Sequence, residues 1–161
     1  MFGRSIQLQN IGRLKRGWGK WYGQLAVAEL KKPLDLRIQI AAKEPVEPFA
    51  EQARLFAATY AQLQEHFRDE LFENNQFYKK LDMEDGGLTK ADFAKHPPVE
   101  SAADVWNVLR PFRLCLGLPM HRYLGNAYLL MDVDWPNPHY FQMYMAASPT
   151  GFEYKHTDFV G

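Results

Sequence analysis

The spacing of large apolar residues changes period twice along this chain, and this change restricts the fold more than any other feature. Between Phe49 and Leu71 such residues recur every three or four positions, at Phe49, Phe56, Tyr60, Leu63, Phe67 and Leu71, with Ala53 filling the gap. That spacing predicts one long amphipathic helix from about Glu47 to Leu81. Pro48 suits the first turn of this helix, and Asn74-Asn75 mark a place where it would bend or break.

On both sides of this helix the period is two, which is typical of half-buried strands. Before the helix, a strand from Leu34 to Ile40 and an earlier one from Gln24 to Leu30 flank Lys31-Lys32-Pro33, so a hairpin is expected there. After the helix, Phe112, Leu114, Leu116 and Leu118 alternate onto one face of a further strand. Strands within 125–135, 140–147 and 151–157 would then complete an antiparallel meander.

Together these elements predict an α+β fold. It would consist of a twisted antiparallel sheet, made of the N-terminal hairpin and the C-terminal meander, with the long helix packed on one face. A short second helix is expected from Ala102 to Leu109, capped by Ser101. The 161 residues contain no repeat or linker, so a single domain over 1–161 is expected. Residues 1–15 lack a clear period and would form a loosely ordered segment or a short edge strand.

The formal net charge is zero, so no overall field favours nucleic acid or a membrane. The charge is nevertheless uneven: residues 1–43 hold nine Lys and Arg against two acidic residues, whereas residues 44–110 hold seven against thirteen. We expect the two segments to pack as neighbours, with an external partner as the alternative. A lone cysteine, Cys115, allows no internal disulfide, and no apolar run approaches the ~18 residues of a membrane span. A cytoplasmic protein that does not bind a membrane is therefore expected.

The stretch from Gly125 to His139 carries the most suggestive chemistry. Alternation along a strand places Leu129, Met131, Val133 and Trp135 on a core face, and Asp132 and Asp134 together on the other. Asp132, Asp134 and His139 would suit a metal-assisted or acid–base hydrolase. Alternatively, both carboxylates face water or bind backbone donors in the turn set by Pro136 and Pro138. Because no third metal ligand lies within reach along the sequence, we assign no catalytic residue, metal or cofactor.

The segment before the first hairpin interleaves aromatic and basic side chains. Trp18, Trp21 and Tyr22 lie among Arg13, Lys15, Arg16 and Lys20. This pattern is found in stacking platforms for single-stranded nucleic acid. The ordinary interpretation, which we favour, is that Trp18 and Tyr22 pack over the sheet while the basic groups stay in water.

Short motifs in this chain resemble a group of small uncharacterised bacterial domains. The motifs are the Gly17-Trp18-Gly19 opening, the acidic amphipathic helix and the D-x-D-W segment that leads to a histidine, here Asp132 to His139. Those domains have been proposed, on genomic context, to include immunity proteins of bacterial toxin systems. The relatives often read W-D-x-E-H where this chain has Asn137 and Pro138 before the histidine. This difference argues against transferring a charged site at this turn, and the resemblance transfers no activity.

The leading hypothesis is a non-enzymatic protein-binding module, immunity-like or regulatory, that presents a polar sheet edge and the acidic helix to a protein partner. Its candidate binding residues are Asp132, Asp134, Trp135, His139, Trp18 and Trp21. The alternatives are the hydrolase and, less favoured, nucleic-acid binding by the basic N-terminal third. An exposed edge strand or the aromatic side of the helix near Phe72 to Tyr78 would also allow a homodimer.

Overall fold

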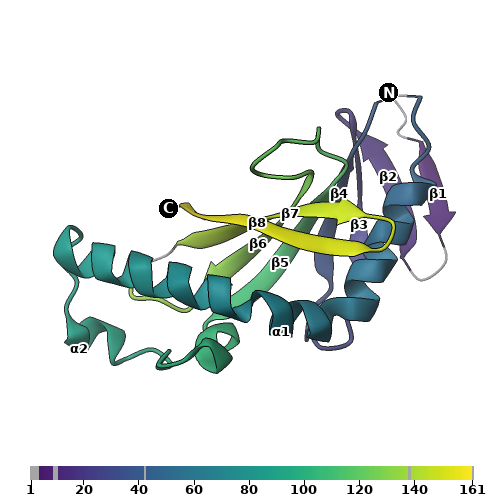
Figure 1. Cartoon of the computed structure of the whole chain (residues 1–161). Helices are drawn as coiled ribbons and strands as arrows, with labels where there is room; N and C mark the ends of the chain where they lie inside the picture. Colours follow the sequence, from purple (N-terminus) through teal and green to yellow (C-terminus); the bar gives the residue numbers. More distant parts are fainter. Residues whose placement is uncertain (1–3, 9–10, 42, 138, 161) are drawn as a thin grey trace.

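The computed structural model describes residues 4–8, 11–41, 43–137 and 139–160, and within them the predicted α+β fold is confirmed (Figure 1). The described strands form one twisted sheet of eight, with one long helix and short helical segments. The elements are β1 (Ser5–Leu8), β2 (Gly12–Gly17), β3 (Lys20–Leu25), β4 (Leu34–Gln39), α1 (Glu47–Glu84), α2 (Lys90–Phe93), the 3-10 helix η1 (Ala102–Asn107), β5 (Leu109–Leu116), β6 (Ala127–Val133), β7 (Tyr140–Ser148) and β8 (Gly151–Val160).

The strands lie in the sheet in their sequence order, from β1 at one edge to β8 at the other. Every neighbouring pair is antiparallel except β4 and β5, which are parallel. The exception arises because α1 carries the chain back along the sheet between these two strands, as a parallel connection requires. The N-terminal hairpins and the C-terminal meander therefore belong to one continuous sheet. None of the described helices is long and apolar enough to cross a membrane.

Helix α1 begins at Glu47 as predicted and runs without a break to Glu84. In Figure 1 it lies along the sheet next to β8, with α2 below its C-terminal end. Its predicted apolar stripe faces the sheet, and the buried members include Phe56, Tyr60 and Leu71. Together with the apolar face of the sheet they form the core.

The break considered at Asn74-Asn75 does not occur, because both asparagines have partners in the fold. The Asn74 Nδ2 donates to the Glu70 carbonyl one turn earlier, at 2.8 Å, and to the Tyr154 hydroxyl, at 3.0 Å. Asn75 is only 3% exposed and accepts from Gln76 Nε2 at 3.1 Å. Side-chain contacts with the rest of the fold thus outweigh the low helix propensity of asparagine.

The first predicted hairpin is present, but its first strand lies earlier than expected. The prediction of a strand over Gln24–Leu30 is wrong after Leu25, where β3 ends and the Leu30 N–H closes a turn onto the Val27 carbonyl at 3.0 Å. Strand β3 begins at Lys20 because Trp18 and Gly19, with φ of 51° and 76°, form a two-residue turn from β2. The segment before this turn forms the β1–β2 hairpin, so β1 is an edge strand.

Strand β5 departs from the predicted alternation at Phe112. The pairing with β6 shifts register between Pro111 and Arg113, which is a β-bulge. Leu114 and Leu116 point to the core as predicted, but Phe112 turns to the opposite face, where its ring lies 5.6 Å from that of Tyr140. The short predicted helix is the 3-10 turn η1, which ends at Asn107, so Leu109 already belongs to β5.

Candidate functional site

The β2–β3 hairpin ends in a tryptophan that the rest of the chain leaves in solvent. Trp18 is 99% exposed, which contradicts the expectation that it packs over the sheet. Its φ of 51° lies in the left-handed region, which is uncommon for a residue other than glycine. Trp21 is buried in the core, and the Arg16 guanidinium lies 5.9 Å from its ring. Of these two candidates, only Trp18 can contact another molecule through its ring.

The two aspartates predicted to lie side by side have different surroundings. Strand β6 ends at Val133, so its alternation does not reach Asp134. Asp132 is exposed opposite Arg110 and Tyr140, and no hydrogen bond or ion pair links its carboxylate to another described residue. Asp132 therefore faces water on the sheet surface.

Asp134 lies just beyond the strand and anchors two other segments. Its Oδ1 accepts from His96 Nδ1 at 2.7 Å, and its Oδ2 accepts from Arg110 Nη2 at 2.8 Å. Its backbone N–H donates to the Val108 carbonyl at 2.7 Å. Because a carboxylate paired with arginine only accepts, Nδ1 of His96 carries the proton of that bond and Nε2 faces away from it. Asp134 thus fixes the segment 90–100 against the sheet end.

His139 does not turn back toward these aspartates. Its Nε2 lies 3.8 Å from Asp82 Oδ2, near the end of α1, and its ring packs tilted against Phe159, with 4.1 Å between ring centroids. Neither ring nitrogen has a hydrogen bond with a described residue. Pro138, which precedes it, lies outside the described residues. His139 therefore belongs to the packing between α1 and β8.

A hydrolase built on Asp132, Asp134 and His139 would need all three in one place, but their side chains lie in three different surroundings. Within the described residues, no group of three or more His, Cys, Asp or Glu side chains is arranged to hold a metal ion. No observation on these three residues favours the hydrolase hypothesis.

Trp135 is buried as predicted, although it lies beyond the end of β6 and outside the strand alternation. Its ring contacts Phe93, Phe141 and Phe159 at centroid distances of 5.5, 5.9 and 5.4 Å. It also lines a cavity with Asp134 and His96, and the volume of this cavity is about 420 Å³. No sequence pattern points to His96, because it lies in a proline-rich connector 38 residues before its partner Asp134.

The sheet face that α1 does not cover carries polar and aromatic side chains, and the charged groups around Asp35 on this face are paired. The Asp35 Oδ2 accepts from Arg113 Nε at 2.7 Å and from Arg37 Nε at 3.2 Å. Cys115 is buried within the sheet, as an inert strand cysteine should be, and this burial raises the pKa of its thiol. Burial, followed by the contact with Cys115, raises the pKa of Tyr128 to about 12.

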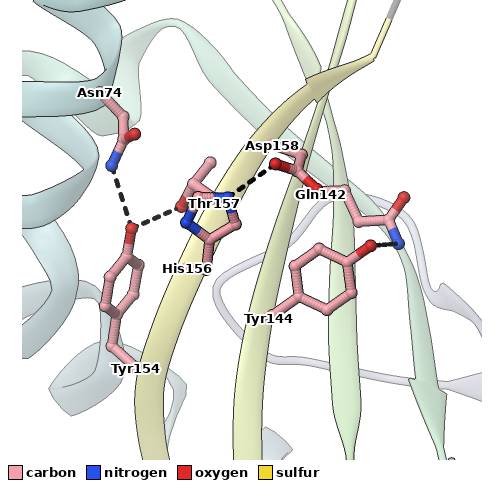
Figure 2. A network of polar contacts seen from close by, with 7 residues as sticks. All are labelled: Asn74, Gln142, Tyr144, Tyr154, His156, Thr157 and Asp158. Atoms are coloured by element: carbon pink, nitrogen blue, oxygen red, sulfur yellow. Dashed lines mark hydrogen bonds and ion pairs between the residues drawn. The ribbon is translucent and has the colours of Figure 1, made fainter. Parts of the chain in front are cut away.

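Figure 2 shows how β8 separates two sets of polar contacts. On the side of α1, the Tyr154 hydroxyl joins Asn74 to Thr157. On the other side, His156 Nε2 and Asp158 Oδ1 are 2.7 Å apart, and the His156 ring stacks on Tyr144. The His156–Asp158 pair is half exposed, which is typical of a surface ion pair between neighbouring positions on one strand face.

Comparisons with known proteins find no matching family model, no matching curated protein and no matching solved structure. The resemblance to the immunity-associated domains therefore stays a prediction from short motifs. The case for the β2–β3 hairpin as a binding site comes from the geometry of this chain.

Proposed function

We propose that this protein is a non-enzymatic binding module, immunity-like or regulatory, that inserts Trp18 into a protein partner with an acidic surface. The observation that carries the proposal is the 99% exposure of Trp18 at a turn position with φ of 51°.

Tryptophan at this position is unfavourable for the free protein. A left-handed backbone costs a residue with a Cβ roughly 1–2 kcal/mol, whereas glycine or asparagine adopts it readily. The exposed ring contributes no packing energy that would offset this cost. Strain at an exposed aromatic residue is a reason to look for an external contact. Tryptophan is also among the residues that most often dominate binding energy in protein interfaces.

The charge around Trp18 indicates the chemistry of the partner. From Arg4 to Ala28 the chain holds basic residues and no acidic one. Lys15 and Lys20 flank the hairpin tip, and neither forms an ion pair with an acidic residue in the described ranges. An acidic surface with an apolar pocket would complement both the charge and the ring.

The proposal is tested with Trp18→Asn, because asparagine accepts a positive φ and keeps the turn intact. Tagged wild-type protein, Trp18→Asn and Tyr123→Ala would be incubated with a lysate of the native host. Tyr123 is 66% exposed on a different loop and serves as the matched control. We expect an acidic protein bound by the wild type and the control, with Trp18→Asn about 30-fold weaker, as a hot spot worth about 2 kcal/mol implies.

The captured protein would then be purified and titrated into the wild type. Burial of Trp18 predicts a blue shift of tryptophan emission that Trp18→Asn lacks. Equal binding by Trp18→Asn, or substrate turnover that is abolished by Asp134→Ala, would contradict a non-enzymatic module that binds through Trp18.

Nucleic-acid binding is the second candidate, because the same hairpin combines an exposed ring with two lysines that form no ion pair with a described acidic residue. Single-stranded RNA or DNA would stack a base on Trp18 and place phosphates near Lys15 and Lys20. Anisotropy titration of a labelled oligonucleotide separates the two candidates. Binding that falls steeply between about 50 and 200 mM salt and is lost in Trp18→Asn would favour nucleic acid over a protein partner.

A further inference from the structure

The cavity beside Asp134 lies at the end of the molecule where α1 ends, away from the hairpin that carries Trp18. Figure 1 shows α2 below the C-terminal part of α1, whereas β1 and β2 lie near its N-terminal part. The cavity is bounded by α1, by the segment around α2 and by Asp134 and Trp135, and its volume is about 420 Å³. This volume is within the range of small-molecule sites, about 300–1,000 Å³.

Asn75 gives this cavity a hydrogen-bond donor. The residue lines the cavity and is only 3% exposed. Its orientation is fixed because Gln76 Nε2 donates both to the Val99 carbonyl, at 3.2 Å, and to Asn75 Oδ1, at 3.1 Å. The Asn75 Nδ2 then has no acceptor among the described residues. An amide donor at the cavity wall that has no acceptor in the protein can donate to a molecule that brings one.

Two lysines add positive charge to the cavity wall. Lys79 and Lys90 line it, and neither forms an ion pair with a described acidic residue. Two carboxylates also line the cavity, but Asp134 is already paired with His96 and Arg110, which leaves Glu100 as the opposing charge. The balance of unpaired charge is positive, so the cavity favours an anionic group.

The remaining wall is apolar and aromatic. The Phe93 and Trp135 rings meet edge to face, with centroids 5.5 Å apart and planes at 70°. The Lys79 ammonium lies 5.2 Å from the centre of the Phe93 ring. Flat apolar walls next to a cation and an amide donor fit a ring that carries an anionic substituent. Because Asp134 holds His96 at 2.7 Å, the segment that forms this wall is anchored before a ligand arrives.

We propose that this cavity binds a small aromatic carboxylate. The carboxylate accepts from Asn75 Nδ2 and faces Lys79 and Lys90, and the ring lies against Phe93 and Trp135. This site is separate from the Trp18 hairpin, so either proposal can fail without the other.

The test uses benzoate as the probe and the full-length, 15N-labelled protein. We expect benzoate to shift the NMR signals of the Asn75 side-chain amide and the Trp135 indole N–H, with saturation in the millimolar range. Benzamide, which has the ring without the charge, and cyclohexanecarboxylate, which has the charge without the aromatic ring, should both bind about tenfold or more weakly.

Substitutions then assign the contacts. Asn75→Leu keeps the side-chain size and removes the donor, and we expect affinity for benzoate to fall about tenfold or more. Lys79→Gln and Lys90→Gln should each weaken binding about two- to fivefold. Lys80→Gln is the matched control, because Lys80 is the next residue on α1, pairs with Glu84 and does not line the cavity. It should leave the affinity unchanged.

The lysine variants keep the test decisive if Asn75→Leu does not fold. The proposal is wrong if no signal shifts at benzoate concentrations up to about 10 mM, because the binding free energy would then be weaker than about −3 kcal/mol. It is also wrong if benzamide binds as tightly as benzoate, or if Lys80→Gln weakens binding as much as Lys79→Gln does.

Discussion

At the residue scale, Gly125 is the position where a single methyl group would conflict most with the backbone. Its φ is +74°, and a Cβ added there would lie 2.2 Å from the Met145 carbonyl oxygen. Gly125→Ala therefore combines a left-handed backbone with a clash against the main chain of β7, and we expect a loss of about 3 kcal/mol or more in the free energy of unfolding. Urea denaturation measures this loss.

Gly151→Ala is the control for Gly125, because a Cβ at Gly151 meets nothing within 4 Å and its φ is not positive. The change should alter the free energy of unfolding by about 0.5 kcal/mol or less. Similar effects of the two substitutions would contradict the role of the close approach at Gly125.

Single residues near the end of β6 differ in how well the sequence predicts their positions. The burial of Trp135 was predictable, because a large aromatic side chain next to a core strand is usually buried even beyond the end of the strand. The position of Asp134 was not, because alternation stops when β6 ends at Val133 and a sequence does not mark that end. Its partner His96 lies in a connector without a period, so only the folded chain brings the two together.

At the element scale, the Tyr154 hydroxyl adds a hydrogen bond to the aromatic contacts that join β8 to α1. The Tyr154 hydroxyl accepts from Asn74 Nδ2 at 3.0 Å and lies 2.8 Å from Thr157 Oγ1, which belongs to a residue that is 1% exposed (Figure 2). Tyr154→Phe leaves the buried Thr157 hydroxyl without this partner, so we expect a loss of about 1–2 kcal/mol in chemical denaturation.

Tyr144→Phe provides the comparison for Tyr154, because its hydroxyl accepts from Gln142 on the other side of the sheet (Figure 2). There water can replace the lost bond, so the expected loss is about 0.5 kcal/mol or less. If Tyr144→Phe lowers the free energy of unfolding as much as Tyr154→Phe does, or more, the hydroxyl on the α1 side of β8 does not contribute more to stability.

The elements themselves were predictable to different degrees. The start of α1 was clear from Pro48 and the apolar spacing, because both are local signals. The early start of β3 and the bulge near Phe112 were not, because the first depends on a positive φ at Trp18 and the second on pairing with β6. The parallel join of β4 and β5 also depends on where α1 returns the chain.

At the scale of the whole molecule, large apolar side chains are exposed in two separate places where a partner could bind. Trp18 lies at one end, and Phe77 and Leu81, which are 60% and 39% exposed, lie one turn apart near the other end of α1. The predicted homodimer, through an exposed edge strand or the aromatic side of α1 near Phe72 to Tyr78, stays a prediction. The residues of the cavity were not recognisable as a group, because α1, the segment around α2 and the end of β6 meet there only after folding.

The whole fold should also lose stability at alkaline pH. Burial raises the pKa of Cys115, Tyr60, Tyr128 and Tyr154 above their ordinary values. The folded state therefore keeps these protons at pH values where the unfolded chain has released them, and the free energy of unfolding falls as pH rises. The decline should begin near the ordinary cysteine value of 9.0, and the part due to Tyr128 should run from 10.0 to about 12.

Urea midpoints measured at pH 7, 9, 10 and 11 test this prediction, with the pH 7 and pH 9 values expected to be close. Tyr128→Phe removes one titrating group, so the variant should lose less stability between pH 10 and pH 11 than the wild type does. Lysines also lose their charge near pH 10.4, but this loss affects both proteins alike. Parallel declines in the two proteins would therefore show that the protonated Tyr128 beside Cys115 does not contribute to the alkaline sensitivity of the fold.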